Sequence, residues 1–514
     1  MGSSTGPHQE PLNKRIPPIL KEEPPSNGGG KRTFARRMLS AAAWAGPTLA
    51  RFGPLRRPLV DSWERKMREG AEAEIEAGIR PPGVTRDRTE MAISILRSIE
   101  RALAQGRLGR PSVNRLLNVL IGDSLVGHGI TSVKDRFKAQ YGQRPPGFLL
   151  ISPTKTCNLR CVGCYADSGP TAEKLEFPII HRMVRETHDL FGGTFIVISG
   201  GEPLAYKDEG KDILDLAEMN PDCFFLMYTN GTLIDDEVAK RMGKLGNITP
   251  AVSVEGLKEA TDRRRGAGVF DKIVAAMERL RREKVILGIS MTATSENADQ
   301  LLSDEVIDFY YNKMGAVYGW LFHYMPMGRA FTLKLLPTPE QRLRMWKRSW
   351  QLVYERHLFL ADFWNSGTAA LGCISAGHEG GYLTVDWNGK FTPCVFVPYS
   401  PVNIRDYYAQ GKTLVDVWQH PFFAKLRSWQ WEYSNEKKFQ KGSWHGNWMM
   451  PCPIRDHYAE FHKMLKEFSP EPVDENALAA MQDPEYHRGM VEYNRAVAEL
   501  FEPIWKSRYM DGQS

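Results

Sequence analysis

Three cysteines on one short loop carry the clearest chemistry in the sequence: Cys157, Cys161 and Cys164. They form a CxxxCxxC pattern directly after a predicted strand at 148–153. Thiolates at this spacing can bind three irons of a 4Fe–4S cluster, and the remaining iron can then be chelated by the amino and carboxylate groups of S-adenosylmethionine. A structural zinc site is the alternative, but zinc would normally take a fourth Cys or His nearby.

The cysteine loop resembles the signature of the radical S-adenosylmethionine (radical SAM) superfamily, and the resemblance continues over 148–327. After the second predicted strand, the motif Gly200, Gly201, Glu202, Pro203 is similar to the family's binding motif for the methionine amino group. Glycines let a backbone approach closely, and a carboxylate can accept hydrogen bonds from an ammonium group. The resemblance implies one-electron cleavage of SAM to methionine and a 5'-deoxyadenosyl radical, which abstracts a hydrogen from a substrate.

Polar residues at the ends of the next predicted strands also match sites of this family. Thr229 ends the third strand, and Ser253 and Glu255 lie at the end of the fourth. The resemblance implies that they contribute to the SAM pocket, with Ser253 and Glu255 on ribose or methionine oxygens. Tyr165, directly after the last cysteine, would pack on adenine or be an ordinary core residue.

Arg265 resembles the arginine that pairs with the methionine carboxylate in this family, and a bidentate guanidinium suits that group. The neighbours Arg263 and Arg264 could do the same, and Thr261 stands where the family usually has His. His323, at the end of the sixth predicted strand, is either a substrate contact or a core histidine.

A second group of cysteines lies nearer the C-terminus. Cys373 and Cys394 belong to a Cys-x15-Gly-x4-Cys pattern, and Cys452 follows. This pattern resembles the start of the auxiliary-cluster extension called SPASM or twitch, and it implies a second 4Fe–4S cluster. The extension usually supplies more cysteines, so the fourth ligand stays open between Asp456, His457, substrate and water. Structural cysteines are the alternative.

The pattern of apolar runs predicts an α/β fold. Six short runs alternate with amphipathic helices, which is typical of repeated β/α units. The runs lie at 148–153, 194–199, 223–229, 249–254, 285–292 and 318–325, and the helices at 177–189, 234–245, 270–282 and 304–314. We expect a partial (β/α)6 TIM-like barrel with its chemistry at the carboxyl ends of the strands.

The chain divides into five predicted segments. They are a disordered tail at 1–30, a basic α-helical extension at 31–145, the radical SAM partial barrel at 146–335, a linker helix (341–360) with a SPASM-like module at 336–470, and C-terminal helices at 471–514.

Composition restricts the location of the protein. Six of the seven cysteines fall in the two groups, which favours metal binding in a reducing cytosol over a disulfide framework. No apolar run reaches the ~20 residues needed to span a bilayer, and no secretory signal is recognised at the N-terminus. We therefore expect a cytoplasmic protein.

One segment adds the option of peripheral contact with the inner face of the membrane. Residues 31–60 hold seven basic residues and no acidic one, interleaved with apolar side chains. Such a segment could lie on an anionic membrane, be a solvated arm, or dock on the protein itself. No nucleic-acid partner is expected, because no binding module accompanies these charges.

These observations favour a radical SAM enzyme that draws electrons from a reductant such as flavodoxin or ferredoxin. Among substrates we favour a membrane lipid, because of the basic, apolar segment at 31–60. The alternatives are a SPASM-type peptide or protein maturase and a non-enzymatic iron–sulfur scaffold or electron carrier. The scaffold would not need the glycine motif or the Ser253 and Arg265 pair.

Overall fold

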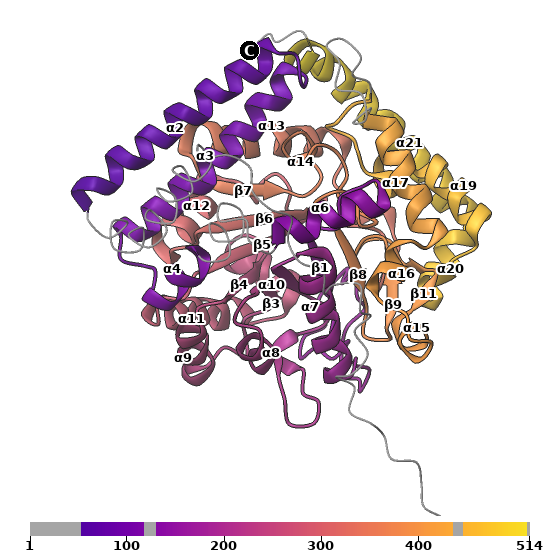
Figure 1. Cartoon of the computed structure of the whole chain (residues 1–514), viewed down its shortest axis with the longest axis horizontal. Helices are drawn as coiled ribbons and strands as arrows, with labels where there is room; N and C mark the ends of the chain where they lie inside the picture. Colours follow the sequence, from indigo (N-terminus) through magenta and orange to yellow (C-terminus); the bar gives the residue numbers. More distant parts are fainter. Residues whose placement is uncertain (1–52, 118–129, 435–445, 511–514) are drawn as a thin grey trace, which may run out of the picture.

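The computed structural model describes residues 53–117, 130–434 and 446–510 (Figure 1). Ten strands form the main sheet in the order β11-β9-β8-β1-β2-β3-β4-β5-β6-β7. Strands β1 to β7 are parallel neighbours in chain order. Their bounds are Phe148–Ile151, Phe195–Ile198, Phe224–Thr229, Ile248–Val254, Gly288–Ala293, Tyr318–His323 and Phe359–Asp362. The first six confirm the predicted strands and the α/β partial barrel.

Helices connect the parallel strands and cover the sheet: α7 packs on β1, α9 and α11 on β4, and α13 on β7. The connecting elements are α7 (Phe177–Phe191), η4 (Pro203–Ala205), α8 (Ile213–Met219), α9 (Asp236–Leu245), α10 (Lys258–Arg265), α11 (Val269–Arg282), α12 (Asp304–Ile307), η5 (Asp308–Met314), η6 (Leu333–Leu335) and α13 (Pro339–Arg356). All four predicted helices between strands are present, the last as α12 followed by the π-helical η5. Apolar periodicity therefore located the layers of the barrel correctly.

The predicted linker helix at 341–360 is wrong at its C-terminal end. Helix α13 stops at Arg356, because His357 adopts a left-handed conformation with φ of 47°. Residues 359–362 then form β7, a further strand that pairs with β6 in parallel register. Four residues directly after a long helix give too short a pattern to predict a strand from the sequence.

The region after α13 extends the barrel sheet on its other edge. Strand β8 (Tyr382–Val385) pairs in parallel with β1, and β9 (Lys390–Thr392) returns antiparallel to β8. The turn between them contains Gly389 at φ of 80°, a conformation that glycine adopts without strain. The second cysteine group is therefore connected to the barrel through one continuous sheet.

The remaining elements after α13 surround this edge of the barrel. They are α14 (Gly367–Ala370), β10 (Tyr399–Ser400), β11 (Val402–Asn403), α15 (Ile404–Ala409), α16 (Leu414–Trp418), α17 (Pro421–Ser434), α18 (Pro453–Asp456), α19 (Tyr458–Phe468), β12 (Glu471–Pro472), α20 (Glu475–Gln482), α21 (Pro484–Ile504) and η8 (Trp505–Met510). Strands β10 and β12 form a separate antiparallel pair.

The described part of the N-terminal extension is helical, with α2 (Gly53–Glu76), α3 (Pro82–Ala104), α4 (Arg110–Leu117) and α6 (Ile130–Tyr141). Asp87 of α3 is fully buried and accepts hydrogen bonds from the hydroxyls of Tyr354 (2.8 Å), Thr368 (2.6 Å) and Tyr509 (2.6 Å). Helix α3 is thereby fixed to α13, α14 and η8. None of the helices in the described ranges is long and apolar enough to cross a membrane.

Candidate functional site

The predicted cysteine loop lies between β1 and α7, at the carboxyl end of the barrel strands. Cys157, Cys161 and Cys164 are free thiols and partly exposed. Burial raises the pKa of Cys157 to about 11, and the nearby charges of Glu202, Cys161 and Cys164 act in the same direction. The three sulfurs therefore share one small region, where a bound metal would stabilise the thiolate form of Cys157.

The donor set of the loop fits a cluster. Residues 155–165 contain three cysteines and no histidine. Within the described ranges, no three Cys, His, Asp or Glu side chains are placed to share a single metal ion. A four-iron cluster has its irons at separate corners, and each of the three thiolates would bind a different iron, so the ligands need not converge on one point.

The glycine motif packs directly against this loop. The amides of Gly201 and Glu202 donate to the carbonyls of Thr154 and Thr156, both at 2.8 Å. A Cβ on Gly201 would lie 2.2 Å from the Thr156 oxygen, and a Cβ on Gly200 would lie 2.7 Å from the Thr154 oxygen. Only glycine permits this approach, so the motif forms a cradle beside the cysteines.

Glu202 joins the ends of two neighbouring strands. Its side chain is fully buried and accepts hydrogen bonds from the Thr229 hydroxyl (2.7 Å) and from the amides of Asn230 (2.7 Å) and Leu204 (3.1 Å). Burial raises the pKa of this carboxyl group. Pro203 begins the short helix η4 that follows. The structure thus brings the glycine motif and Thr229 together, and Glu202 links the ends of β2 and β3.

Glu255 orients the predicted arginine. Its buried carboxylate is paired with both Arg264 and Arg265, and the Arg265 Nε lies 2.9 Å from Oε1. The Nη1 of Arg265 is on the side of the cysteine loop, 4.0 Å from the Cys161 sulfur. Arg263 is exposed and pairs with Glu259 of its own helix instead. The geometry thus separates Arg265 from its neighbour Arg263.

Two further predicted residues lie near the cradle. The hydroxyl of Tyr165 bonds the Ser199 hydroxyl (2.8 Å) and accepts from the Gly200 amide (3.2 Å). Ser253 is partly exposed on β4, beside Ser290 of β5. Tyr165 is therefore anchored at the end of β2, whereas Ser253 lies near the end of β4, two strands away in the sheet.

Arg329, which follows β6, was not identified as a site residue from the sequence. It donates through Nη1 to the Cys161 carbonyl (2.6 Å) and through Nε to Asp167 (3.0 Å). Its own amide donates to the Cys164 carbonyl at 3.0 Å. The residue therefore fixes the backbone of the cysteine loop at Cys161 and Cys164. In the sequence, only the position of Arg329 shortly after the sixth predicted strand points to this role.

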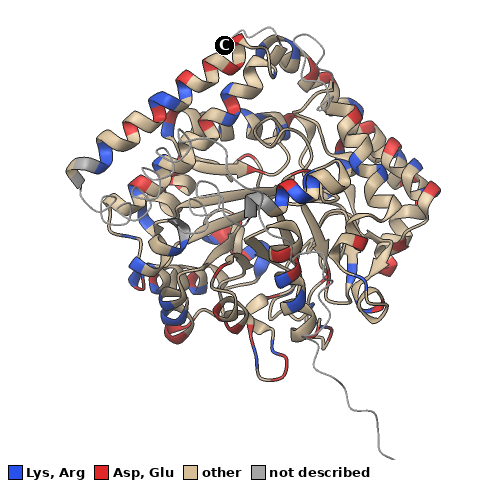
Figure 2. Ribbon diagram, viewed as in Figure 1, with Lys and Arg blue, Asp and Glu red and all other residues tan. Residues whose placement is uncertain are grey.

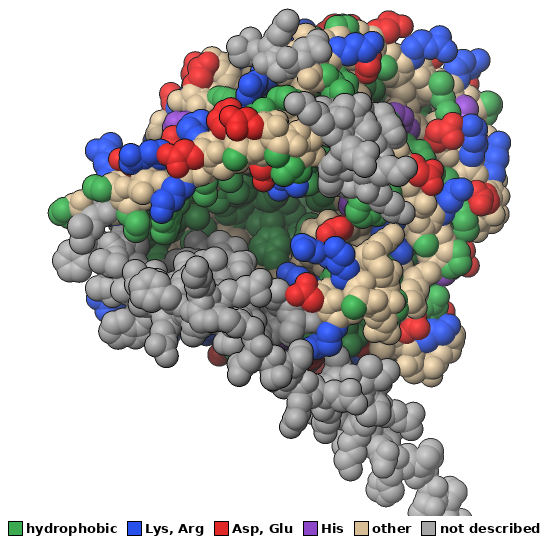
Figure 3. Space-filling model, turned by 45° about the horizontal axis from the view of Figure 1, so that its top comes forward, with side chains coloured by type: hydrophobic (Ala, Val, Ile, Leu, Met, Phe, Trp, Pro, Cys, Tyr) green, Lys and Arg blue, Asp and Glu red, His purple; other side chains and the backbone are tan. Residues whose placement is uncertain are grey.

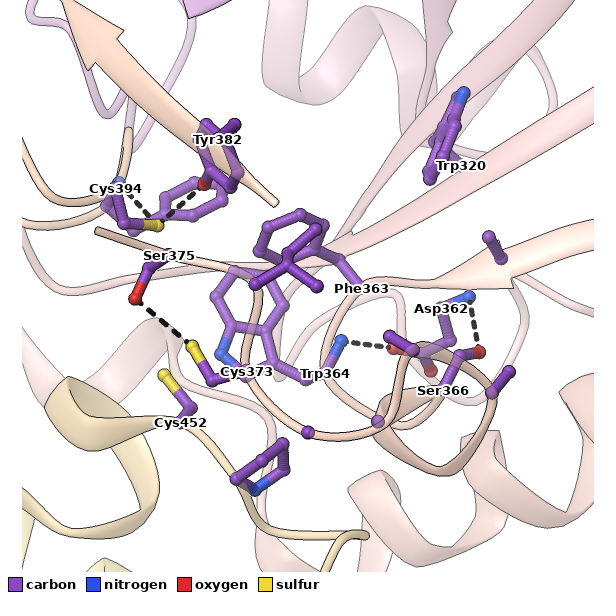
Figure 4. Close-up of a pocket in the computed structure, with 18 of the residues that line it drawn as sticks. Trp320, Asp362, Phe363, Trp364, Ser366, Cys373, Ser375, Tyr382, Cys394 and Cys452 are labelled. Atoms are coloured by element: carbon purple, nitrogen blue, oxygen red, sulfur yellow. Dashed lines mark hydrogen bonds between the residues drawn. The ribbon is translucent and has the colours of Figure 1, made fainter. Parts of the chain in front are cut away.

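The second cysteine group lines one cavity of about 270 Å³ (Figure 4). The Tyr382 hydroxyl lies 2.8 Å from the Cys394 sulfur, and the Ser375 hydroxyl lies 3.2 Å from the Cys373 sulfur. Cys452 faces the same cavity from the start of α18. Burial raises the pKa of Cys394 to about 12. Three thiols with hydroxyl donors around one cavity fit the ligand set of an auxiliary cluster.

The two side chains considered as a fourth ligand have other partners. Asp456 is fully buried against Arg342 and accepts from the Cys452 amide at 3.2 Å. The Nε2 of His457 lies 2.8 Å from the Met450 carbonyl. Asp456 would have to give up one of these contacts to act as a ligand, whereas His457 can keep its bond through Nε2 and offer Nδ1.

Comparison with known proteins agrees with this geometry. Residues 151–303 match the family model described as the Radical SAM superfamily. Fe-coproporphyrin III synthase of Methanosarcina barkeri is 34% identical over 160 residues, which cover 31% of this chain and 40% of that protein. AdoMet-dependent heme synthase of the same organism is 25% identical over 312 residues (55% and 85%), and the mycofactocin maturase MftC of Mycolicibacterium smegmatis is 28% identical over 293 residues (53% and 70%).

Two solved structures are also similar. Streptococcus suis SuiB bound to S-adenosylmethionine has a TM-score of 0.46 at 19% identity, over 57% of this chain and 71% of SuiB. Native anSMEcpe with bound AdoMet has a TM-score of 0.41 at 22% identity, over 50% and 78%. Because residues 151–303 match this family model and contain the cysteine loop and the glycine cradle, this part of the chain is a radical SAM domain, and the cofactors of that family are a 4Fe–4S cluster and S-adenosylmethionine.

Proposed function

We propose that the chain reductively cleaves SAM and removes a hydrogen atom from a substrate. The observation that carries this proposal is the packing of Gly200 and Gly201 against the loop of Cys157, Cys161 and Cys164. When bound, the cluster supplies the electron that cleaves SAM to methionine and a 5'-deoxyadenosyl radical, which takes the hydrogen. We propose a flavodoxin or ferredoxin as the source of that electron.

The other residues hold SAM or the groups that bind it. Arg265, oriented by Glu255, offers its Nη1 to the methionine carboxylate, and the partly exposed Ser253 offers its hydroxyl to the ribose. Glu202 and Thr229 bond each other, so they fix the cradle that receives the methionine amino group. The ring of Tyr165 packs on the adenine of SAM, while its hydroxyl bonds the Ser199 hydroxyl at the end of β2.

Replacing Gly201 with alanine is expected to weaken SAM binding by at least about tenfold, because the added Cβ would meet the Thr156 carbonyl and displace the loop. Equilibrium dialysis of SAM with the iron-loaded protein measures the change. Gly70→Ala is the matched control, because a Cβ there meets no atom within 4 Å. Equal affinities of the two variants would count against the cradle.

We propose a second cluster on Cys373, Cys394 and Cys452, within the module at 336–470. Replacing Cys394 with alanine is expected to remove about four irons per chain while the first cluster remains. Iron and sulfide analysis with electron paramagnetic resonance measures both. Tyr382→Phe, which removes the hydroxyl next to the Cys394 sulfur, should keep the iron and lower the reduction potential of this cluster. Unchanged iron content in Cys394→Ala would contradict the second cluster.

We further propose a membrane lipid as the substrate, taken up by a cytoplasmic protein that touches the inner face of the membrane. None of the relatives named above is described as acting on a lipid, so support comes from the chain's own surface. Residues 31–52 of the predicted contact segment lie outside the described residues. Helix α2, which follows them, exposes Leu59 (40%), Trp63 (42%) and Met67 (37%) at intervals of four residues. Side chains at this spacing share one face of a helix.

Liposome flotation tests this contact. Figure 2 shows both basic and acidic residues along α2. We therefore expect the apolar face of this helix, rather than its net charge, to decide binding to vesicles. Wild type is expected to float with phosphatidylglycerol-containing vesicles, and Trp63→Ser should reduce the floated fraction several-fold. Leu478→Ser is the control, because Leu478 is equally exposed (40%) on α20. Equal flotation of wild type and Trp63→Ser would remove this support.

A peptide or protein maturase is the second candidate, favoured by the similarity to the mycofactocin maturase MftC. A neighbouring short gene encoding a precursor peptide would favour this candidate. Modification of that peptide by the iron-loaded protein, detected as a mass change, would replace the lipid proposal.

A further inference from the structure

The cavity lined by Cys373, Cys394 and Cys452 extends beyond the three thiols. Phe363 and Trp364 lie between the thiols and its far side, as Figure 4 shows. We call the far side the apolar end of the cavity. Its lining comes from four separate elements: Met91 of α3, Trp320 of β6, Phe359 and Ala361 of β7, and Ala369 and Ala370 of α14.

The lining offers no available charge to a ligand. Asp362 is the one charged residue among the lining residues, and its two oxygens are occupied. Oδ1 accepts from the amides of Trp364 and Asn365, both at 3.1 Å, and Oδ2 accepts from the Asn365 Nδ2 (2.8 Å) and the His323 Nε2 (3.1 Å). No lining residue is a cation, and the buried guanidinium of Arg455, which is not part of the lining, is stacked 4.9 Å from the centroid of the Trp364 ring. An ammonium would find no unpaired anion among the lining residues. Burying either charge without a partner is costly.

The cavity also lies close to the cysteine loop of the barrel. The ring of Phe396, which lines the cavity, is 4.8 Å from that of Trp364 and 5.8 Å from that of Tyr165, the residue after Cys164. Phe396 therefore separates the cavity from the region of the glycine cradle. Figure 3 shows a hollow below helix α2 that is lined by hydrophobic side chains.

The size and the mouth of the cavity allow a ligand to enter. Its volume of about 270 Å³ includes the space that the proposed second cluster would take beside the thiols, so the apolar end has room for only a small part of a substrate. Ala370 is exposed, and Met91, Ala361 and Ala369 are partly exposed, so solvent reaches part of the lining at this end. The indole N–H of Trp320 is buried and has no hydrogen-bond partner among the described residues, so it could bind one neutral acceptor atom.

We propose that the apolar end binds an uncharged hydrocarbon part of the substrate, next to the second cysteine group. The inference rests on the radical chemistry proposed above and places the hydrocarbon part of the substrate in this cavity. It also gives the N-terminal extension a role, because α3 supplies one wall of the cavity through Met91. The propionate groups of a porphyrin or a charged peptide side chain would not fit this end.

A pair of probes that differ in charge tests the proposal. Isothermal titration calorimetry with the full-length, iron-loaded protein would compare n-decanol with decanoate, which share one chain length. We expect n-decanol to bind at least about tenfold more tightly than decanoate. Ala361→Leu, which fills the apolar end, should weaken n-decanol binding by a similar factor. Ala73→Leu, on the exposed side of α2, should leave it unchanged.

The outcomes separate this inference from the proposed reaction. Equal binding of the two probes, no binding of n-decanol, or full binding by Ala361→Leu would overturn the inference. If Ala361→Leu does not load iron, Ala369→Leu tests the same space from the wall formed by α14. Failure to form 5'-deoxyadenosine would instead contradict the reaction, whatever the probes show.

Discussion

Replacing Cys161 with alanine is expected to abolish formation of 5'-deoxyadenosine and to lower the iron content by about four atoms per chain. Its loop supplies three thiols and no other Cys or His, so removal of one leaves too few ligands to hold the cluster. The second cysteine group lies on other elements and should keep its iron. Anaerobic reconstitution, iron and sulfide counting, and chromatography of the nucleoside products after dithionite reduction measure the effect.

Cys223→Ala is the matched control for this variant. Cys223 is completely buried just before β3 and belongs to neither cysteine group. The Cys223→Ala variant is expected to keep its iron and to form the nucleoside product. Its stability should fall only modestly, because one sulfur is removed from the core. Loss of iron in Cys223→Ala equal to that in Cys161→Ala would show that the effect is not specific to the loop.

Replacing Arg342 with leucine is expected to lower the free energy of unfolding by about 3–5 kcal/mol, because it leaves Asp456 as a buried charge without its partner. Both side chains are completely buried. The guanidinium also donates to Asn365 (3.1 Å) and to the Met449 carbonyl (3.2 Å). Since Asp456 accepts from the Cys452 amide, iron at the second cysteine group should fall as well. Urea denaturation followed by circular dichroism, together with iron analysis, measures both effects.

Arg344→Leu on the same helix provides the comparison. Arg344 is 57% exposed and pairs with the exposed Asp299, so its loss should cost about 0–1 kcal/mol. The double variant Arg342→Leu/Asp456→Leu should recover part of the lost stability, because no unpaired charge remains buried. If Arg342→Leu and Arg344→Leu unfold at the same urea concentration, the buried pair does not hold the module together.

The barrel and its cysteine loop could be predicted from the sequence because their signals are local. Strands β1 to β6 are apolar runs between amphipathic helices, and Cys157, Cys161 and Cys164 lie within eight residues of one another. Gly200 and Gly201 also follow directly after β2, so their position beside the loop follows from the parallel sheet.

The remaining features depend on contacts between distant parts of the chain. Arg329 binds a loop more than 160 residues earlier, and Met91 reaches the cavity of the second cysteine group from the N-terminal extension. The pairing of β8 with β1 is also a long-range contact. No pattern within a short window reports such contacts, so these residues could be assigned to the site only from the structure.

The most direct test of the central claim is the release of 5'-deoxyadenosine by the reconstituted wild-type protein after dithionite reduction in the presence of S-adenosylmethionine. We expect this product together with methionine in about equal amounts. A protein that binds its iron fully but forms no 5'-deoxyadenosine, with n-decanol, lipid or peptide present or absent, would contradict it and favour an iron–sulfur scaffold.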